Sequence, residues 1–400
     1  MMTATTAGQA PAELDLDPFS EAFLSDPYPR HEKMREAGPV VWLKAYGIWA
    51  SARFAEVQAA LQDWRTFSSA AGVGLSDFRK ETPWRPPSLV LEADPPLHSR
   101  TRPVLAQALA PTVLKALEAD FRAEAEALAG ELAARGRFDG MTDLAEVFPI
   151  RAFADALGLP QQGREHLIPY AAAVFNAFGP RNALFEQTNA RSEAARAWVA
   201  AQCSREALAP GSIGASVFEG ADRGEVSEAE AGMLVRSLLS AGLDTTVHGI
   251  GNSLYCLAAH PDQWALLRED PSRARNAFEE ALRYEAPVQT FFRTTTRATE
   301  LGGVRLGEGE KIMLLLSAAN RDPRRWTEPE RFDIGRRAGG NMAFGSGIHG
   351  CVGQMVARLE AEIVLKALAE RIGALELAGP PVWRLNNTLR GLASLPIAVG

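Results

Sequence analysis

From about residue 93 onward, apolar residues recur mainly every three or four positions, the spacing of helices that bury one face. This pattern predicts helices over about 97–109, 111–135, 141–158, 161–178, 184–204, 227–259, 262–268, 271–286 and 354–372, after two earlier ones ending near Ala37 and Gln62. Strands are expected near 40–42, 46–50, 291–297, 299–306, 311–315 and 382–398, and a loop over 210–224, which contains Pro and Gly. The predicted fold is mainly α, with small β-sheets at its edge.

Composition sets limits on the class of protein. The chain has 400 residues, of which 46% are hydrophobic, and a net charge of -7 argues against nucleic acid as a general partner. No repeat or linker divides it, so we expect a loose N-terminal segment over 1–16 and a single domain over 17–400. The three cysteines have unrelated spacings, which fits a reduced, cytoplasmic compartment. No signal peptide and no apolar run of about 18 residues occur, so no contact with a membrane is expected.

A glycine-rich loop places a cysteine directly before a predicted helix. The sequence from Phe344 to Gly353 is Phe-Gly-Ser-Gly-Ile-His-Gly-Cys-Val-Gly, with Cys351 near its end. A thiolate is a strong electron-donating ligand for iron, and glycines such as Gly345 let a backbone lie close to a flat macrocycle. Taken alone, a buried cysteine in a turn is the commoner interpretation of Cys351.

The whole loop resembles the haem-binding signature of the cytochrome P-450 monooxygenases, and the resemblance extends from about residue 17 to the end. It implies the fold of that family and a haem b (iron protoporphyrin IX) with Cys351 as axial ligand. The absence of an N-terminal anchor resembles the soluble bacterial members. Four residues then correspond to the cationic clamp on the haem propionates: His98, Arg102, Arg293 and His349.

The predicted long helix contains Ala241-Gly242-Leu243-Asp244-Thr245-Thr246, in which a glycine and an acid–alcohol pair weaken helical preference at adjacent positions. Local widening there would open a groove for a small ligand. The resemblance identifies this segment as the dioxygen-binding groove. Thr245 would hydrogen-bond dioxygen, Asp244 would relay protons, and Thr246 would complete the catalytic set, with Ala241, Gly242 and Gly345 against the haem.

Glu280 and Arg283 lie three residues apart, hence on one helical face, which alone is usually a surface ion pair. In the family, such a pair and the arginine of Pro329-Glu330-Arg331-Phe332 form a buried triad behind the haem. We therefore expect Glu280, Arg283 and Arg331 to have a structural role.

Several segments resemble more narrowly the bacterial enzymes that oxidise para-substituted benzoates. These are Trp-Arg-Pro-Pro-Ser (84–88), Phe-Asn-Ala-Phe-Gly-Pro (175–180), and the sequences around Ser237 and Phe291. The resemblance implies a carboxylate held by Arg85, Ser88 and Ser237. It also implies a pocket wall formed by Leu91, Val174, Phe175, Phe178, Ala241, Val288 and Phe291. From spacing alone, Arg85 could equally be a surface residue.

The predicted activity is O-demethylation or benzylic hydroxylation of a 4-methoxybenzoate-like acid with O2. Electrons would come from a [2Fe-2S] ferredoxin and its NAD(P)H-dependent reductase. Nearness to haem-side motifs makes Arg100, Arg336, Arg337 and Arg358 candidate contacts for the ferredoxin. Three alternatives stay open: a peroxygenase of the same fold, a haem-binding sensor without turnover, and an oxidase of a terpene or macrolide.

Overall fold

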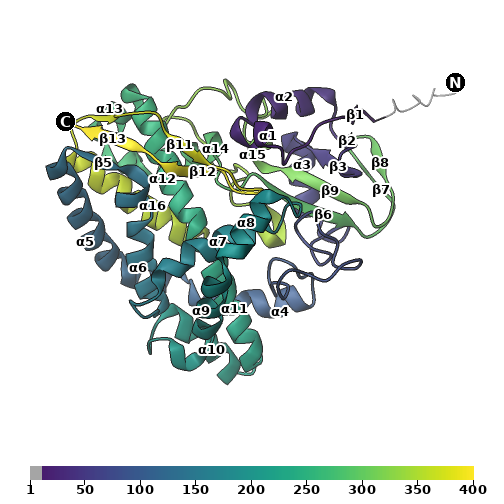
Figure 1. Cartoon of the computed structure of the whole chain (residues 1–400), viewed down its shortest axis with the longest axis horizontal. Coiled ribbons are helices and arrows are strands. Elements are labelled where there is room, and N and C mark those ends of the chain that lie inside the picture. The colour runs from purple at the N-terminus through teal and green to yellow at the C-terminus, as the bar shows by residue number, and fades with distance from the viewer. Residues whose placement is uncertain (1–10) are drawn as a thin grey trace.

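The computed structural model describes residues 11–400 and contains mostly helices (Figure 1). The helices are α1 (Glu21–Ser25), α2 (Tyr28–Ala37), α3 (Phe54–Gln62), α4 (Leu97–Ala108), α5 (Pro111–Arg135), α6 (Val147–Leu157), α7 (Leu167–Asn176), α8 (Ala183–Arg191), α9 (Glu193–Gln202), α10 (Ile213–Asp222), α11 (Glu228–Ala241), α12 (Asp244–Ala259), α13 (Pro261–Glu269), α14 (Ala274–Tyr284), α15 (Leu316–Ala319) and α16 (Gln354–Arg371). The mainly α fold is therefore confirmed.

The strands form one larger sheet and three small ones, at the edge of the helical part in Figure 1. The larger sheet has the order β1 (Glu13–Leu14), β2 (Val41–Leu43), β3 (Ile48–Ser51), β9 (Lys311–Leu315), β6 (Thr290–Thr295) and β4 (Phe67–Ser68). The others are β10 (Leu375–Leu377) with β13 (Pro396–Val399) and β5 (Arg137–Asp139), β11 (Val382–Arg384) with β12 (Gly391–Ser394), and β7 (Thr299–Leu301) with β8 (Val304–Leu306).

The N-terminal prediction needs one correction. Residues 1–10, where the loose segment and the absence of a signal peptide were predicted, lie outside the described residues. Glu13 and Leu14, however, pair in parallel with Trp42 and Leu43, so the ordered fold begins before residue 17. Among residues 11–400, no helix has the length and apolar character needed to cross a membrane.

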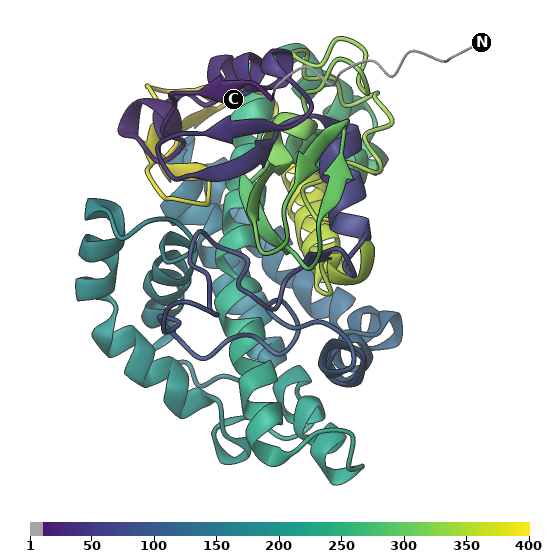
Figure 2. The same cartoon turned by 90° about the vertical axis from the view of Figure 1, so that its right-hand side faces the viewer.

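Helices α11 and α12 form the column on which the rest of the helical part is arranged, and Figure 2 shows them running through the middle of the molecule. The predicted capping box begins this column: Ser227 accepts from the N–H of Glu230, whose side chain accepts from the N–H of Ser227. The helix predicted over 227–259 is interrupted at Gly242 and Leu243. Nearly the whole of α12 is buried, which explains its apolar residues on all sides.

The predicted loop over 210–224 is wrong, because α10 occupies residues 213–222. Ser212 caps its first turn by accepting from the N–H of Ala215. The glycines permit close packing instead of ending the helix: a Cβ on Gly214 would lie 2.6 Å from the carbonyl oxygen of Leu157, and one on Gly220 would lie 2.8 Å from Val104. Tertiary packing therefore overrides the weak helical propensity of glycine.

Three predicted helices have different limits in the structure. The one over 141–158 begins with a π-helical turn (Gly140–Ala145) before α6, the one over 161–178 starts only at Leu167, and the one over 184–204 divides into α8 and α9 at Ser192. The hydroxyl of Ser192 donates to the carbonyl of Asn189, which competes with continuation of the helix.

Candidate active site

A cavity of ≈ 220 Å³ lies between the α11–α12 column and the cysteine loop. Seventeen of the predicted site residues line it: Arg85, Ser88, Leu91, Arg102, Val174, Phe175, Phe178, Ser237, Ala241, Gly242, Thr245, Thr246, Val288, Phe291, Gly345, His349 and Cys351. They come from α4, α7, α11, α12, β6 and loops far apart in the sequence. Two further predicted residues, His98 and Arg293, are buried beside the cavity wall.

The cysteine loop presents a thiol to this cavity. The N–H of Cys351 donates to the carbonyl of Phe344 (2.8 Å), which closes the loop. Gly347 has φ 70° and lies so close to α3 that a Cβ would be 2.5 Å from the carbonyl oxygen of Leu61, so only glycine fits. Burial raises the pKa of the Cys351 thiol, while the N–H of Gly353 and the guanidinium of Arg102 act in the opposite direction. A backbone N–H and a positive charge thus already act on the sulfur.

Histidine and arginine side chains gather at one edge of the cavity. The rings of His98 and His349 lie 4.7 Å apart between centroids. Burial lowers the pKa of His349, and the nearby charge of Arg293 acts in the same direction. His98 Nε2, His349 Nε2 and Arg293 Nε are buried without hydrogen-bond partners. Asp94, which sequence reasoning missed, lies 3.6 Å from His349 Nε2. Three buried nitrogens without hydrogen-bond partners at this edge favour a polar ligand here, because buried polar groups are otherwise satisfied.

The interruption of the helical column is held by two hydroxyl groups. Thr245 Oγ1 donates to the carbonyl of Ala241 (2.7 Å), and Thr246 Oγ1 donates to that of Gly242 (3.1 Å). The break between α11 and α12 at Gly242 and Leu243 agrees with the weakened helical preference of this segment. Asp244 is fully buried and does not line the cavity, because its side chain faces His248 on the next turn. The spacing of four residues between Asp244 and His248 is the sequence signal that would have found this pair.

The polar end of the cavity is formed by two loop residues and one residue of α11. Ser88 Oγ and Ser237 Oγ lie 3.2 Å apart, and Arg85 is mostly buried. Glu92, which sequence reasoning missed, pairs with Arg85 (2.9 Å) and accepts from the N–H of Ser88 (2.7 Å). Arg85 is therefore no surface residue. Its charge is balanced by a carboxylate that does not itself line the cavity.

Aromatic rings form part of the cavity wall. Phe175 and Phe178 meet edge to face at 5.7 Å between centroids, and Phe178 and Phe291 do so at 5.9 Å. The guanidinium of Arg85 lies 5.8 Å from the ring of Phe178. A flat apolar molecule with one anionic end matches this distribution of groups.

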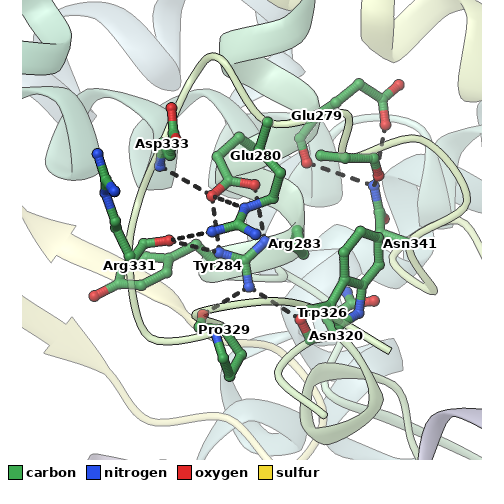
Figure 3. A network of polar contacts seen from close by, with 12 residues as sticks. Glu279, Glu280, Arg283, Tyr284, Asn320, Trp326, Pro329, Arg331, Asp333 and Asn341 are labelled. Carbon is green, nitrogen blue, oxygen red and sulfur yellow. Dashed lines mark hydrogen bonds and ion pairs between the residues drawn. The ribbon is translucent and has the colours of Figure 1, made fainter. Parts of the chain in front are cut away.

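The predicted buried triad is right in two members and wrong in the third. Arg283 donates two hydrogen bonds of 2.8 Å to Glu280, and both are fully buried (Figure 3). The side chain of Arg331 instead points away from them and is 58% exposed beside Glu328; only its carbonyl accepts from Arg283. Arg336 takes the third place, with Nε 3.1 Å from the Glu280 carboxylate. A turn at Pro329 and Glu330 redirects the chain before Arg331, which the motif alone does not reveal.

Of the four arginines predicted to contact a ferredoxin, two are mostly buried and two are at least partly exposed. Arg336 and Arg358 are mostly buried, Arg336 on Glu280 and Arg358 on Glu279, so neither guanidinium is free for a partner. Arg100 is about half exposed and pairs with Glu230. Arg337 is exposed.

Comparisons with known proteins identify the family. A family model described as "Cytochrome P450" matches residues 187–372. The chain is 57% identical over 396 residues to "Cytochrome p450 CYP199A2" of Rhodopseudomonas palustris, covering 99% of this chain and 96% of that protein. It is 34% identical to "Cytochrome P450 107B1" of Saccharopolyspora erythraea, covering 99% and 100%. The solved structure of CalO2 has a TM-score of 0.84 at 32% identity, covering 96% and 98%.

The chain therefore belongs to the cytochrome P450 family. It is a monooxygenase of the bacterial kind, which uses O2 and redox partners and holds haem through a cysteine thiolate. The site fits this group. Among the described residues Cys351 is the only cysteine at the cavity, since Cys203 and Cys256 lie elsewhere. The unpartnered buried nitrogens of His98, His349 and Arg293 are compatible with a ligand that carries polar groups at this edge.

Proposed function

We propose that this enzyme oxidises a small para-substituted aromatic acid of the 4-methoxybenzoate type, by O-demethylation or benzylic hydroxylation. The observation that carries the proposal is that Arg85, Ser88 and Ser237 gather on the wall of the same cavity that Cys351 and several aromatic rings line. Eight residues separate Ser237 from Thr245, which at the regular helical rise is about 12 Å, and the break at Gly242 and Leu243 lies within this span. That separation suits one benzene ring with a carboxylate at one end and a short para substituent at the other.

Cys351 would hold the haem iron, and His98, Arg102, Arg293 and His349 would bind the propionates. When bound, the thiolate-ligated haem supplies activation of O2 and the oxidising power for the reaction. The N–H of Gly353 and the guanidinium of Arg102 stabilise the thiolate, because both act on the pKa of Cys351 in the direction that favours the anion. Gly345, Ala241 and Gly242 line the cavity that the haem would enter.

Arg85, Ser88 and Ser237 bind the substrate carboxylate, while Phe178 and Phe291 confine the ring. A flat substrate fixed at one end has little rotational freedom, so its para substituent stays directed toward the cysteine side of the cavity. Neutral analogues would enter the same apolar space without the fixed end. The enzyme would therefore discriminate between substrates by position more than by affinity.

Asp244, Thr245 and Thr246 would deliver protons from the interior to the cavity. Burial raises the pKa of Asp244 to about 7, so the carboxyl can both hold and release a proton near neutral pH. Thr245 lines the cavity one residue further on and can exchange its bond to Ala241 for one to a ligand. A peroxygenase would not need this acid–alcohol pair, so the presence of Asp244 and Thr245 favours the monooxygenase over that alternative.

The electrons would come from a [2Fe-2S] ferredoxin, reduced by an NAD(P)H-dependent reductase, that docks on the cysteine side of the molecule. Exposed Arg337 and half-exposed Arg100 remain candidate contacts for an acidic partner. Arg336 and Arg358 are not proposed as contacts, because their guanidinium groups form ion pairs with Glu280 and Glu279.

The decisive experiment is an optical titration of the ferric, haem-loaded protein with 4-methoxybenzoate and, in parallel, with its methyl ester. The proposal predicts a low- to high-spin Soret shift with the acid and little shift with the ester. A thiolate-type spectrum without response to either compound would leave the enzyme class intact and overturn the substrate. Turnover with peroxide alone would favour the peroxygenase, and a lack of ligand-dependent NAD(P)H consumption with ferredoxin and reductase would favour the sensor.

A further inference from the structure

The side chain of Lys311, on β9, ends inside a ring of backbone carbonyls. Its ammonium nitrogen lies 2.5 Å from the carbonyl oxygen of Ser76, 2.8 Å from that of Gly74, 3.2 Å from that of Gly72 and 3.4 Å from that of Ala71. All four oxygens belong to one loop, and the lysine is 8% exposed. An ammonium has three N–H groups, so four oxygens around it resemble the shell of a bound cation.

The 71–76 loop depends on this ammonium because it has no regular structure of its own. Gly72 adopts φ 95°, and the loop is closed further by a bond from the N–H of Phe78 to the carbonyl of Ala71. Without the ammonium, carbonyls at Gly72, Gly74 and Ser76 would converge on one buried point with no donor between them. Buried carbonyls without donors are strongly disfavoured, so the loop would have to open.

The 71–76 loop is hydrogen-bonded to the backbone of two segments that line the substrate cavity. The N–H of Leu75 donates to the carbonyl of Phe178 (2.7 Å), and a Cβ on Gly74 would lie 2.6 Å from that oxygen. On the other side, the N–H of Phe292 donates to the carbonyl of Val73 (2.9 Å), directly after Phe291. No residue of 71–76 lines the cavity itself. The loop therefore acts on Phe178 and Phe291 through their backbones.

We propose that Lys311 is a positioning residue for substrate binding: its ammonium acts as a built-in cation that holds the 71–76 loop and so sets the spacing of Phe178 and Phe291. Charged neighbours on the loop side are Asp77, Arg79, Lys80 and Glu81. Asp77 is neutralised by a bidentate bond from Arg79, so the nearest fixed partners of the ammonium are the carbonyl dipoles. Burial lowers the pKa of Lys311 to about 8, and the amine keeps its proton at neutral pH.

The first test measures amide hydrogen exchange of residues 71–78 in the ferric, haem-loaded protein, which needs no substrate. Lys311→Met removes the charge and the donors but keeps the length, and we expect exchange in this loop to rise at least tenfold with an unchanged Soret spectrum. The matched control is Lys115→Met, since Lys115 is exposed on α5; its loop exchange should equal that of the wild type. Wild-type protection in Lys311→Met would overturn the proposal. If that variant does not bind haem, Lys311→Gln replaces it with the same criterion.

The second test distinguishes a cation site from ordinary packing. In Lys311→Ala the emptied carbonyl ring should accept a small monovalent cation, so ammonium or potassium chloride should restore protection of residues 71–78. Tetramethylammonium chloride at equal ionic strength is too large and should not. An equal effect of all salts would contradict the cation role.

The role of Lys311 rests on the proposed function only where 4-methoxybenzoate is used as the ligand. The Kd of 4-methoxybenzoate should rise about tenfold in Lys311→Met and stay unchanged in Lys115→Met. An unchanged Kd beside an opened loop would reject the link to Phe178 and Phe291. If the wild type does not bind 4-methoxybenzoate, the substrate proposal fails, while the exchange experiments still decide the role of the lysine in holding the loop.

Discussion

The carboxylate of Asp244 lies 3.4 Å from Nε2 of His248, and neither side chain has access to solvent. Neither carboxylate oxygen nor His248 Nδ1 has a hydrogen-bond partner among the described residues. The imidazole of His248 packs against Gly391 of β12, so closely that a Cβ on Gly391 would lie 1.9 Å from Nδ1. Arg384, paired with Glu146, is the charged group that acts on both. The proposed proton donor is thus shielded from solvent, with His248 beside it and Arg384 as the charged group that acts on its pKa.

Asp244→Asn should slow product formation roughly 100-fold, the usual size of the contribution of a positioned acid. Haem content and the Kd of 4-methoxybenzoate should stay unchanged, because the side chain does not line the cavity. Product formation in the reconstituted system, measured beside optical titration, tests this. Asp120→Asn on the exposed side of α5 is the control. Unchanged turnover in Asp244→Asn would remove Asp244 from the mechanism.

The stability of the wild type relative to Asp244→Asn should depend on pH. Burial raises the pKa of Asp244 from 3.8 to about 7, so the folded state keeps a proton that the unfolded state releases between these values. The wild type should therefore lose stability relative to the variant, by a few kcal/mol, as the pH rises from about 4 to about 7.

His248 must be separated from this effect. Burial lowers its pKa to about 3, which gives a slope of the opposite sign between that value and 6.5. The histidine is present in both proteins, so the difference between their unfolding free energies isolates Asp244. Urea unfolding from pH 4 to 8 provides the measurement. A difference that stays flat across this range would show that Asp244 ionises normally in the folded protein.

Arg336 and Arg331 should differ in their effect on stability, in contrast to the motif-based expectation. Arg336→Ala should lower the unfolding free energy by about 1–3 kcal/mol, because it removes donors from buried Glu280 and from two loop carbonyls. Arg331→Ala should change it by less than about 0.5 kcal/mol, since that side chain is exposed. Urea unfolding followed by circular dichroism and Soret absorbance compares them. A larger loss of unfolding free energy in Arg331→Ala than in Arg336→Ala would support the triad of Glu280, Arg283 and Arg331 expected from the sequence.

Glu92→Gln should tighten binding of a carboxylate ligand several-fold while leaving the methyl ester unaffected. Glu92 balances the charge of Arg85, and removing that balance leaves a mostly buried guanidinium for which the ligand carboxylate becomes the partner. The ligand-free variant should be less stable than the wild type and should recover stability on binding the acid. Optical titration and thermal unfolding with and without 4-methoxybenzoate measure both effects. Weaker binding of the acid would mean that Glu92 is needed to orient Arg85.

The sequence by itself determined the family, the cysteine, and most helices and strands. Its signals are local: the loop around Cys351, the acid–alcohol pair at Asp244 and Thr245, and apolar periodicity, which sets α3 and α5 at the predicted limits. Such features depend on neighbouring residues, so spacing along the chain is enough to find them.

Only the tertiary structure decided which distant groups meet. Arg336 replaces Arg331 on Glu280, Glu92 neutralises Arg85, and Lys311 reaches a loop more than 200 residues earlier in the chain. The glycines of α10 were interpreted as a loop signal. Their role is to allow close packing against Leu157 and Val104, which belong to other helices and are not visible from the local sequence. Side-chain partners across such separations follow from how the elements pack, and burial then fixes their charge, neither of which local spacing contains.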